Sequence, residues 1–136
     1  MAGSLPLESV VTCFLECDGS ILLLRRSRNV GSFKGKWAAV SGYIETTALE
    51  QAYTEIAEET GLQPDEVELV SAGRPVKAEG EGSGWLVHPF LFGIEDRDRI
   101  RLDWEHSQMR WIKPEEIGGY DTVPMLKEAL AEVYDI

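Results

Sequence analysis

Three glutamates stand close together near the middle of the chain, at a spacing that could place them around one metal ion. Glu55, Glu58 and Glu59 occupy positions i, i+3 and i+4, which share one side of an α-helix. Like charges at this spacing repel, at a cost of roughly 0.2–0.5 kcal/mol per pair. A hard divalent cation would remove that repulsion, because Mg²⁺ binds carboxylate oxygens and keeps waters for substrate phosphates. The alternative is a solvated acidic face in an acidic protein.

The helix that would carry these glutamates has clear limits in the sequence. Thr47 and Glu50 form a capping box at its start, and Gly61 stands where a C-terminal cap belongs. Apolar side chains recur at helical spacing and predict one buried stripe, made of Leu49, Ala52, Tyr53 and Ile56. The sequence therefore predicts a helix over 48–60, with the glutamates beside the stripe and Glu58 as the most outward of them.

Strands rich in branched apolar residues surround this helix, and Asp18-Gly19 is a turn signal between the first two of them. The order of elements predicts an α/β fold of a single domain over 1–136, with a mixed sheet packed between helices. We expect strands over 9–16, 21–26, 37–40, 67–77, 85–94 and 108–112, a loop over 27–36, one helical turn over 114–117, and a closing helix over 123–134.

The charge balance narrows the possible partners. The chain has 24 acidic and 13 basic residues, for a formal net charge of −11. Such a surface repels nucleic acids and anionic membranes, so we expect neither as a partner. An anionic small substrate stays compatible, because a bound cation inverts the local field. Segment 1–8 lacks the features of a signal peptide and no apolar run approaches about 20 residues, so we expect a cytoplasmic protein.

The two cysteines are expected to be ordinary buried thiols. Cys13 and Cys17 lie four residues apart in a predicted strand. This spacing puts them on one face of the strand but roughly 13 Å apart, too far for a mutual disulfide. The pair points weakly to a reducing compartment.

The residues around the predicted helix resemble the signature of the MutT-like Nudix hydrolase family. That signature is a glycine, five residues, a glutamate, seven residues, then Arg-Glu-apolar-x-Glu-Glu-x-Gly-apolar. Segment 55–62, Glu-Ile-Ala-Glu-Glu-Thr-Gly-Leu, matches it at every specified position. The segments before and after it also resemble the family, at 21–26, 35–37, 105–112 and 114–116. The resemblance covers nearly the whole chain and implies a Nudix-type α/β/α sandwich.

The chain departs from the signature in two places. Thr54 stands where the family has an arginine that holds a catalytic carboxylate in place. The interval from Gly42 to Glu55 is two residues shorter than the signature, and the gap falls in the turn after Glu45. Thr46 then stands where the signature has its first glutamate. These departures leave an alternative function open, a catalytically impaired module that binds a nucleotide or a protein.

The resemblance implies a pyrophosphohydrolase that uses Mg²⁺, with Mn²⁺ as a substitute. Its substrate would be a nucleoside triphosphate or a nucleoside diphosphate derivative, cleaved at a diphosphate linkage. The implied metal ligands are Glu55, Glu58 and Glu59, with the backbone carbonyl of Ser41 or Gly42. Glu55 or Glu58 is the first choice of general base and Glu105 the second, while a solvated loop acid is an equal interpretation of Glu105. Many members of the family are dimers, which leaves a homodimer open beside a monomer.

A basic stretch before the signature is expected to meet the substrate phosphates. Arg26, Arg28 and Lys36 are the candidates, although solubilising charges around a loop are an alternative. Arg25 and Arg26 point to opposite faces of a strand, so at most one of the two lines the site. Aromatic residues could stack on a base or serve the core instead, and these are Phe33, Trp37, Tyr43 and Trp85. His88 and His106 show no metal or triad pattern and are expected to be structural or peripheral.

Overall fold

The computed structural model describes residues 6–135, and every structural statement below concerns that range. Both ends of the predicted domain, residues 1–5 and 136, lie outside it. The strands are β1 (Leu7–Cys17), β2 (Ser20–Arg26), β3 (Trp37–Ala38), β4 (Val40–Tyr43), β5 (Glu68–Ala72), β6 (Val76–Gly80), β7 (Ser83–Gly93) and β8 (His106–Ile112). The helices are α1 (Ala48–Thr60) and α2 (Leu126–Val133), with three 3₁₀ helices at Pro64–Glu66, Arg97–Arg99 and Pro114–Gly119.

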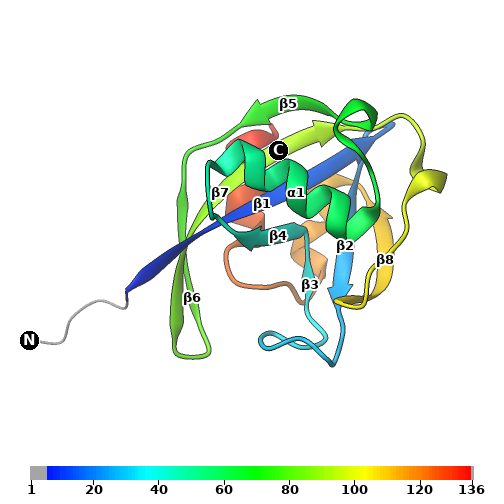
Figure 1. The fold of residues 1–136 in the computed structure, drawn as a ribbon. Helices are drawn as coiled ribbons and strands as arrows, with labels where there is room; N and C mark the ends of the chain where they lie inside the picture. The colour runs from blue at the N-terminus through cyan, green and yellow to red at the C-terminus, as the bar shows by residue number, and fades with distance from the viewer. Residues whose placement is uncertain (1–5, 136) are drawn as a thin grey trace, which may run out of the picture.

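A mixed sheet lies between the two helices. Its central path is β3-β2-β1-β7-β5, while β4 pairs with β1, β6 with β7 and β8 with β2. β1 runs parallel to β7 and antiparallel to β2 and β4. Figure 1 shows α1 across the front of the sheet and α2 behind it. The predicted α/β fold, a mixed sheet with helices on both sides, is confirmed. Within the described range, no helix is long and apolar enough to cross a membrane.

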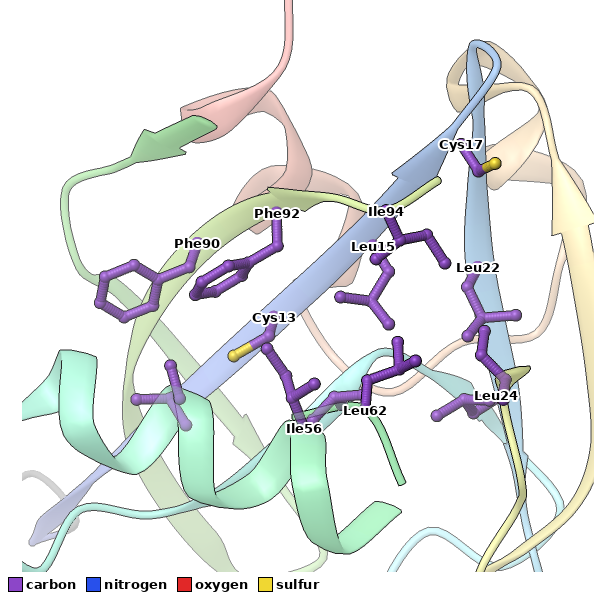
Figure 2. Packing of buried hydrophobic residues seen from close by; sticks show 14 residues of the cluster. Cys13, Leu15, Cys17, Leu22, Leu24, Ile56, Leu62, Phe90, Phe92 and Ile94 are labelled. Carbon is purple, nitrogen blue, oxygen red and sulfur yellow. The ribbon is translucent and has the colours of Figure 1, made fainter. Parts of the chain in front are cut away.

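Alternate side chains of the central strands supply the two halves of the core. Cys13 and Leu15 of β1 belong to the cluster beneath α1, whereas Phe14 between them belongs to the cluster beneath α2. Figure 2 shows the first cluster, in which Ile56 of α1 packs among residues of β1, β2 and β7. Cys13 and Cys17 are buried free thiols, as the sequence predicted.

The predicted bounds of α1 and its C-terminal cap are confirmed, and of the predicted capping box the Thr47 half is found. The Thr47 side chain accepts a hydrogen bond from the backbone N–H of Glu50 at 3.2 Å, and Gly61 adopts a left-handed conformation with φ 80°. The predicted apolar stripe was wrong at one position, because Leu49 is exposed. Gln51 is buried instead, and its polar side chain turns toward Glu55.

Two other predicted elements differ from the structure in their bounds, because the backbone is constrained at a proline and at a residue with positive φ. The single strand expected over 67–77 is two strands, β5 and β6, separated by Gly73-Arg74-Pro75. Proline has no N–H to donate and fits poorly inside a paired strand. The helix expected over 123–134 begins only at Leu126, because Met125 has a left-handed backbone with φ 65°.

Candidate metal and nucleotide site

The three glutamates of α1 meet very different environments. Glu59 is 1% exposed, Glu55 is half-buried, and Glu58 is exposed to solvent. The helix therefore turns two carboxylates toward the sheet and leaves the third at the outer edge. The predicted order of exposure, with Glu58 outermost, is confirmed, although Glu59 lies far deeper than a boundary position.

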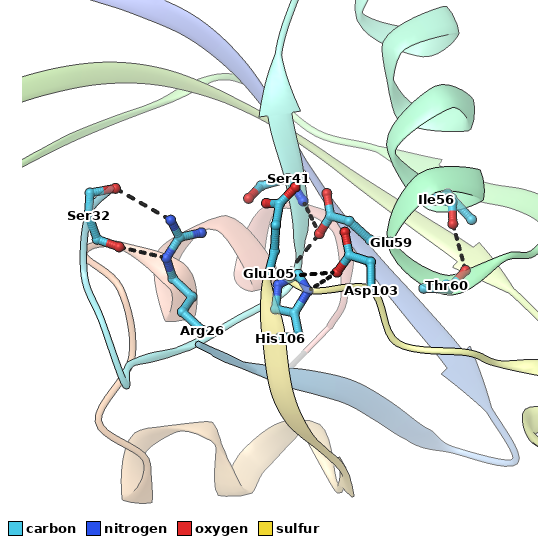
Figure 3. Close-up of polar contacts among 9 residues, drawn as sticks. All are labelled: Arg26, Ser32, Ser41, Ile56, Glu59, Thr60, Asp103, Glu105 and His106. Atoms are coloured by element: carbon cyan, nitrogen blue, oxygen red, sulfur yellow. Dashed lines mark hydrogen bonds and ion pairs between the residues drawn. The ribbon is translucent and has the colours of Figure 1, made fainter. Parts of the chain in front are cut away.

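Glu59 is held in an incomplete polar environment (Figure 3). Its Oε1 accepts a long hydrogen bond from the backbone N–H of Ser41 at 3.4 Å and lies 3.6 Å from Nε2 of His106. Its Oε2 is buried and, among the described residues, has no hydrogen-bond partner. A buried carboxylate oxygen without a partner is costly, so it is the place where a ligand would have the largest effect.

His106 connects Glu59 to a further acid. The imidazole is buried, and its Nδ1 lies 3.1 Å from Oδ1 of Asp103. Burial lowers the pKa of His106, although its hydrogen bond to the Asp103 carboxylate acts in the opposite direction. The sequence prediction of a structural or peripheral role did not place His106 against Glu59, because the two residues are far apart in the chain and no local pattern links them.

A fourth acid, Glu105, approaches the α1 glutamates from the loop before β8. Burial raises the pKa of Glu59, and the charges of Glu105 and Glu55 raise it further. Burial is also the main reason why the pKa values of Glu55 and Glu105 are raised. The charge of Glu58 adds a smaller upward contribution to the pKa values of both residues. The fold thus gathers four carboxylates that repel one another.

The donor set fits a hard cation such as Mg²⁺. Within 6–135, no group of three or more His, Cys, Asp or Glu side chains is arranged so that it could hold a metal ion, so the protein has no ready-made metal cage. Mg²⁺ does not require such a cage, because it usually keeps several waters and takes one or two carboxylates. Glu55 and Glu59, the two carboxylates that α1 turns toward the sheet, would be such ligands, with the unpartnered Oε2 of Glu59 available, whereas Glu58 as a third ligand stays a prediction. Ser41 and Gly42 of β4 lie beside these carboxylates, since the Ser41 N–H donates to Glu59 and a Cβ atom at Gly42 would meet Glu55; their carbonyls as metal ligands stay a prediction.

Gly42 allows the close approach of β4 to Glu55. A Cβ atom added at Gly42 would stand 2.2 Å from Cδ of Glu55, far closer than non-bonded atoms approach. Only glycine leaves room there for the carboxylate. In this structure, the close packing of β4 against the Glu55 carboxylate therefore explains the glycine that begins the signature.

A cavity of about 360 Å³ extends from these carboxylates. Glu55, Glu105 and Arg26 line its polar part, together with Gly42 and Gln51. The rest of its wall is mainly apolar and comes from β1, β6, β7 and the start of α2, including Val10, Ala78, Val87, Leu126 and Ala129. A cavity with one charged and one apolar part suits an amphipathic ligand.

Aromatic side chains also line the cavity. Phe33 and Trp85 pack edge to face with ring centroids 5.5 Å apart. Trp85 Nε1 donates a hydrogen bond to the hydroxyl of Tyr43 at 3.5 Å. The sequence predicted all three as stacking candidates, and the structure brings them together.

The predicted phosphate-binding residues separate into two groups. Arg26 lines the cavity, where its guanidinium donates to the backbone oxygen of Ser32 at 2.9 Å. Arg28 lies outside the cavity wall. Lys36 forms an ion pair with Asp121 at 2.8 Å.

Trp37 also lies outside the cavity and packs edge to face on Tyr120 with a centroid distance of 5.8 Å. Arg25, as expected from strand alternation, donates to the backbone of Gly35 and lines no part of this cavity.

The pattern of the NUDIX domain matches residues 6–135. The chain belongs to the Nudix family. Nucleoside triphosphatase NudI of Escherichia coli is 25% identical over 123 residues, which make up 84% of this chain and 87% of that protein. Putative nudix hydrolase 1 of Caenorhabditis elegans is 27% identical over 123 residues, 83% of this chain, and this Nudix chain covers 32% of that longer relative.

Solved structures share the Nudix fold at lower identity. A MutT protein from Methanosarcina mazei Go1 has a TM-score of 0.80 at 24% identity, with 96% of this chain and 94% of that chain covered. An Ap4A hydrolase from C. elegans has a TM-score of 0.75 at 16% identity, covering 93% and 94%. The NUDIX domain of Shewanella oneidensis NrtR, complexed with ADP ribose, has a TM-score of 0.70 at 16% identity, covering 93% and 88%. These likenesses show the fold of the chain.

Proposed function

We propose that this Nudix protein is a pyrophosphohydrolase that uses Mg²⁺ or Mn²⁺ to cleave a diphosphate linkage. The substrate is a nucleoside triphosphate or a nucleoside diphosphate derivative. One observation carries the proposal: a single cavity has carboxylates and Arg26 in one part and an apolar, aromatic wall in the other. The names of relatives that act on nucleoside triphosphates and on Ap4A agree with this substrate class.

The carboxylate part suits the diphosphate only if a cation is present, because Glu45, Glu55 and Glu105 would otherwise repel phosphate. A bound Mg²⁺ would supply the positive charge that stabilises the developing negative charge on the phosphate oxygens. Arg26 is the basic side chain of the cavity wall, and its guanidinium can bind a phosphate oxygen that the cation leaves uncovered.

The reaction requires a group that takes a proton from the attacking water. The new bond joins the water oxygen to phosphorus, and the bridging P–O bond breaks. Glu45, Glu55 and Glu105 are the described carboxylates that line the cavity; we take Glu55 or Glu105 as the group that accepts the proton, whereas Glu58 faces solvent. Burial raises the pKa of both candidates, which makes each a stronger base than an ordinary carboxylate.

The apolar part is suited to the nucleoside. Phe33 and Trp85 offer aromatic faces, and Val10 and Val87 offer apolar surface for a base. Thr12 of β1 is a hydroxyl group in this wall that could donate or accept one hydrogen bond. We therefore expect stacking and shape to govern the choice of base.

A second function is motivated by the shortened turn after Glu45 and by Thr54 at the arginine position. In that case the protein binds metal and nucleotide but does not cleave the diphosphate. The two functions share one site and differ only in turnover.

Hydrolysis of a panel of nucleotides tests the proposal. Nucleoside triphosphates, nucleotide sugars, ADP-ribose and dinucleoside polyphosphates are incubated with wild-type protein in Mg²⁺ or in EDTA. We expect cleavage of at least one class in Mg²⁺ and none in EDTA. Glu59→Gln should lower kcat/KM by about 10–100-fold, the usual cost of disturbing a metal site. Glu50→Gln, an exposed acid in the first turn of α1, is the matched control and should retain full activity.

Cleavage that persists in EDTA, or that survives Glu59→Gln unchanged, would refute the proposed site. Binding of Mg²⁺ and nucleotide without turnover on any substrate would establish the second function instead.

A further inference from the structure

The arginine that holds a catalytic carboxylate in this family is missing from the chain. Thr54 replaces the arginine of the signature, and its hydroxyl donates to the backbone oxygen of Glu50 at 3.1 Å. Its side chain is exposed on the outer side of α1. Thr46, which stands at the missing glutamate, is exposed as well. Neither threonine forms a hydrogen bond with Glu55 in the described structure.

Gln51 occupies the place between Glu55 and the shortened turn. It is 8% exposed, although a polar side chain on a surface helix normally faces solvent. Its Nε2 donates a hydrogen bond to Oε2 of Glu55 at 2.7 Å, one helical turn further along. Its Oε1 accepts the backbone N–H of Glu45 at 3.1 Å. Because a backbone N–H can only donate, this second bond orients the amide with its NH₂ group toward Glu55.

The opposite side of the Glu55 carboxylate is bounded by Gly42. A Cβ atom at position 42 would stand 2.4 Å from Oε1 and 2.2 Å from Cδ of Glu55. The carboxylate is thus confined between the Gly42 backbone and the Gln51 amide. The hydrogen bond from Gln51 favours the charged form of Glu55, against the effect of burial.

We propose that Gln51 is a positioning residue for Glu55 and takes over the function of the absent arginine. This inference rests on the proposed function and adds the reason why the shortened turn is tolerated. The Gln51 side chain connects the turn at Glu45 to Glu55 on the helix. Glu55 therefore stays directed at the proposed metal site, although the turn is two residues shorter than in the signature. Gln51 lines the edge of the same cavity, and the role proposed for it is exerted through its hydrogen bond to Glu55.

Three variants and a double variant test this role. Gln51→Leu has a similar size and removes both hydrogen bonds. Gln51→Glu keeps the acceptor for the Glu45 N–H but places a like charge against Glu55. Thr54→Ala is the control, because Thr54 bonds only to its own helix. Gln51→Leu combined with Thr54→Arg restores the arginine of the signature.

The first measurement is Mn²⁺ binding to the metal-free protein, followed by electron paramagnetic resonance without nucleotide. We expect Gln51→Leu and Gln51→Glu to weaken Mn²⁺ binding by about tenfold or more, with Thr54→Ala unchanged. The second is steady-state hydrolysis, in which kcat should fall for both Gln51 variants while KM stays within about twofold. The double variant should regain part of the lost Mn²⁺ affinity.

Wild-type Mn²⁺ affinity and kcat in folded Gln51→Leu would overturn the positioning role and leave the proposed function intact. An equal loss in Thr54→Ala would also overturn it, because the effect would then be a general property of the helix surface. A wild-type protein that binds no Mn²⁺ would overturn both proposals together. Near-ultraviolet circular dichroism of each variant in EDTA separates these outcomes from unfolding.

Discussion

The two helices cover opposite faces of one sheet and differ in what they bury. The buried residues of α2 are all apolar, namely Leu126, Ala129, Leu130 and Val133. Those of α1 include two apolar and three polar residues, namely Gln51, Ala52, Ile56, Glu59 and Thr60. α1 packs mainly on β4 and β1, whereas α2 packs mainly on β7 and β5.

The buried face of α2 serves packing alone, whereas that of α1 also carries polar groups of the candidate site. The α2 face gains stability from every side chain that it buries. The α1 face buries a carboxylate with an unpartnered oxygen and carries no basic residue in its last turn, where the helix dipole disfavours acids. The α1 face of the metal-free protein is therefore the less stable arrangement, and a cation would compensate for it. Four substitutions test this contrast.

The largest effect is expected on the α2 face. Leu130 is fully buried, and Leu130→Ala should lower the free energy of unfolding by about 2–5 kcal/mol through lost burial and a residual cavity. Urea denaturation followed by circular dichroism measures this change as a lower midpoint. Leu49→Ala on the exposed side of α1, at 38% exposure, is the control and should cost well under half as much. Equal losses at the two positions would contradict the contrast.

Two glycine substitutions should separate stability from activity. A Cβ atom at Gly73 would meet the backbone oxygen of Glu132 in α2 at 2.8 Å, so Gly73→Ala must displace backbone. We expect a loss of about 1–3 kcal/mol in unfolding free energy with little change in kcat/KM. Gly42→Ala displaces only the flexible end of Glu55, so stability should change by less than about 1 kcal/mol while kcat/KM falls about tenfold or more.

Urea denaturation and steady-state hydrolysis of both alanine variants check this pair. If Gly42→Ala unfolded the protein, or if it left hydrolysis untouched, the close packing of Gly42 on Glu55 would have no functional meaning.

The smallest effect is a gain of stability. In EDTA at neutral pH, Glu59→Gln should raise the free energy of unfolding by about 1–2 kcal/mol, because it removes a buried charge with an unpartnered oxygen. The added stability from Mg²⁺ should be lost in the same variant. In EDTA, Glu58→Gln, at an exposed position, is the control and should change stability by less than about 0.5 kcal/mol. Thermal melts in EDTA and in Mg²⁺ measure both effects.

The pH dependence of the metal-free protein follows from the same carboxylate. Burial raises the pKa of Glu59 above its ordinary value of 4.5. Glu59 therefore has a higher pKa in the folded protein than in the unfolded chain. At a pH between these two values the folded protein binds more protons than the unfolded chain, so the free energy of unfolding decreases as the pH rises through the folded-state pKa. Glu59→Gln should flatten this slope but not remove it, because the pKa values of Glu55 and Glu105 are raised as well. A wild-type stability that rises with pH over this range would contradict the assignment.

The sequence predicted α1 closely because its signals are local. Thr47, Gly61 and the spacing of apolar residues act within a few positions of the helix. The exception was Leu49, which periodicity placed in the core and the structure exposes. Periodicity could not identify Gln51 as buried, because its partners Glu45 and Glu55 are fixed by the fold of the turn.

The remainder of the candidate site was set by long-range pairing. Glu105 and His106 reach α1 because β8 pairs with β2, in a register that sets His106 opposite Arg26. Phe33 approaches Trp85 because the loop after β2 lies against the β6–β7 hairpin, where the Phe33 N–H donates to Glu81 at 3.2 Å. Sequence spacing contains no information on either contact.

The sequence by itself determined the composition of the site, since the run from Glu55 to Leu62 fixes which carboxylates α1 carries and how they are spaced. Tertiary structure alone decided their environment. It buried Glu59 without a partner for Oε2, left Glu58 in solvent and confined Glu55 between Gly42 and Gln51. The physical reason is that helix periodicity sets directions around an axis, whereas burial depends on which strands and loops the sheet brings against that axis.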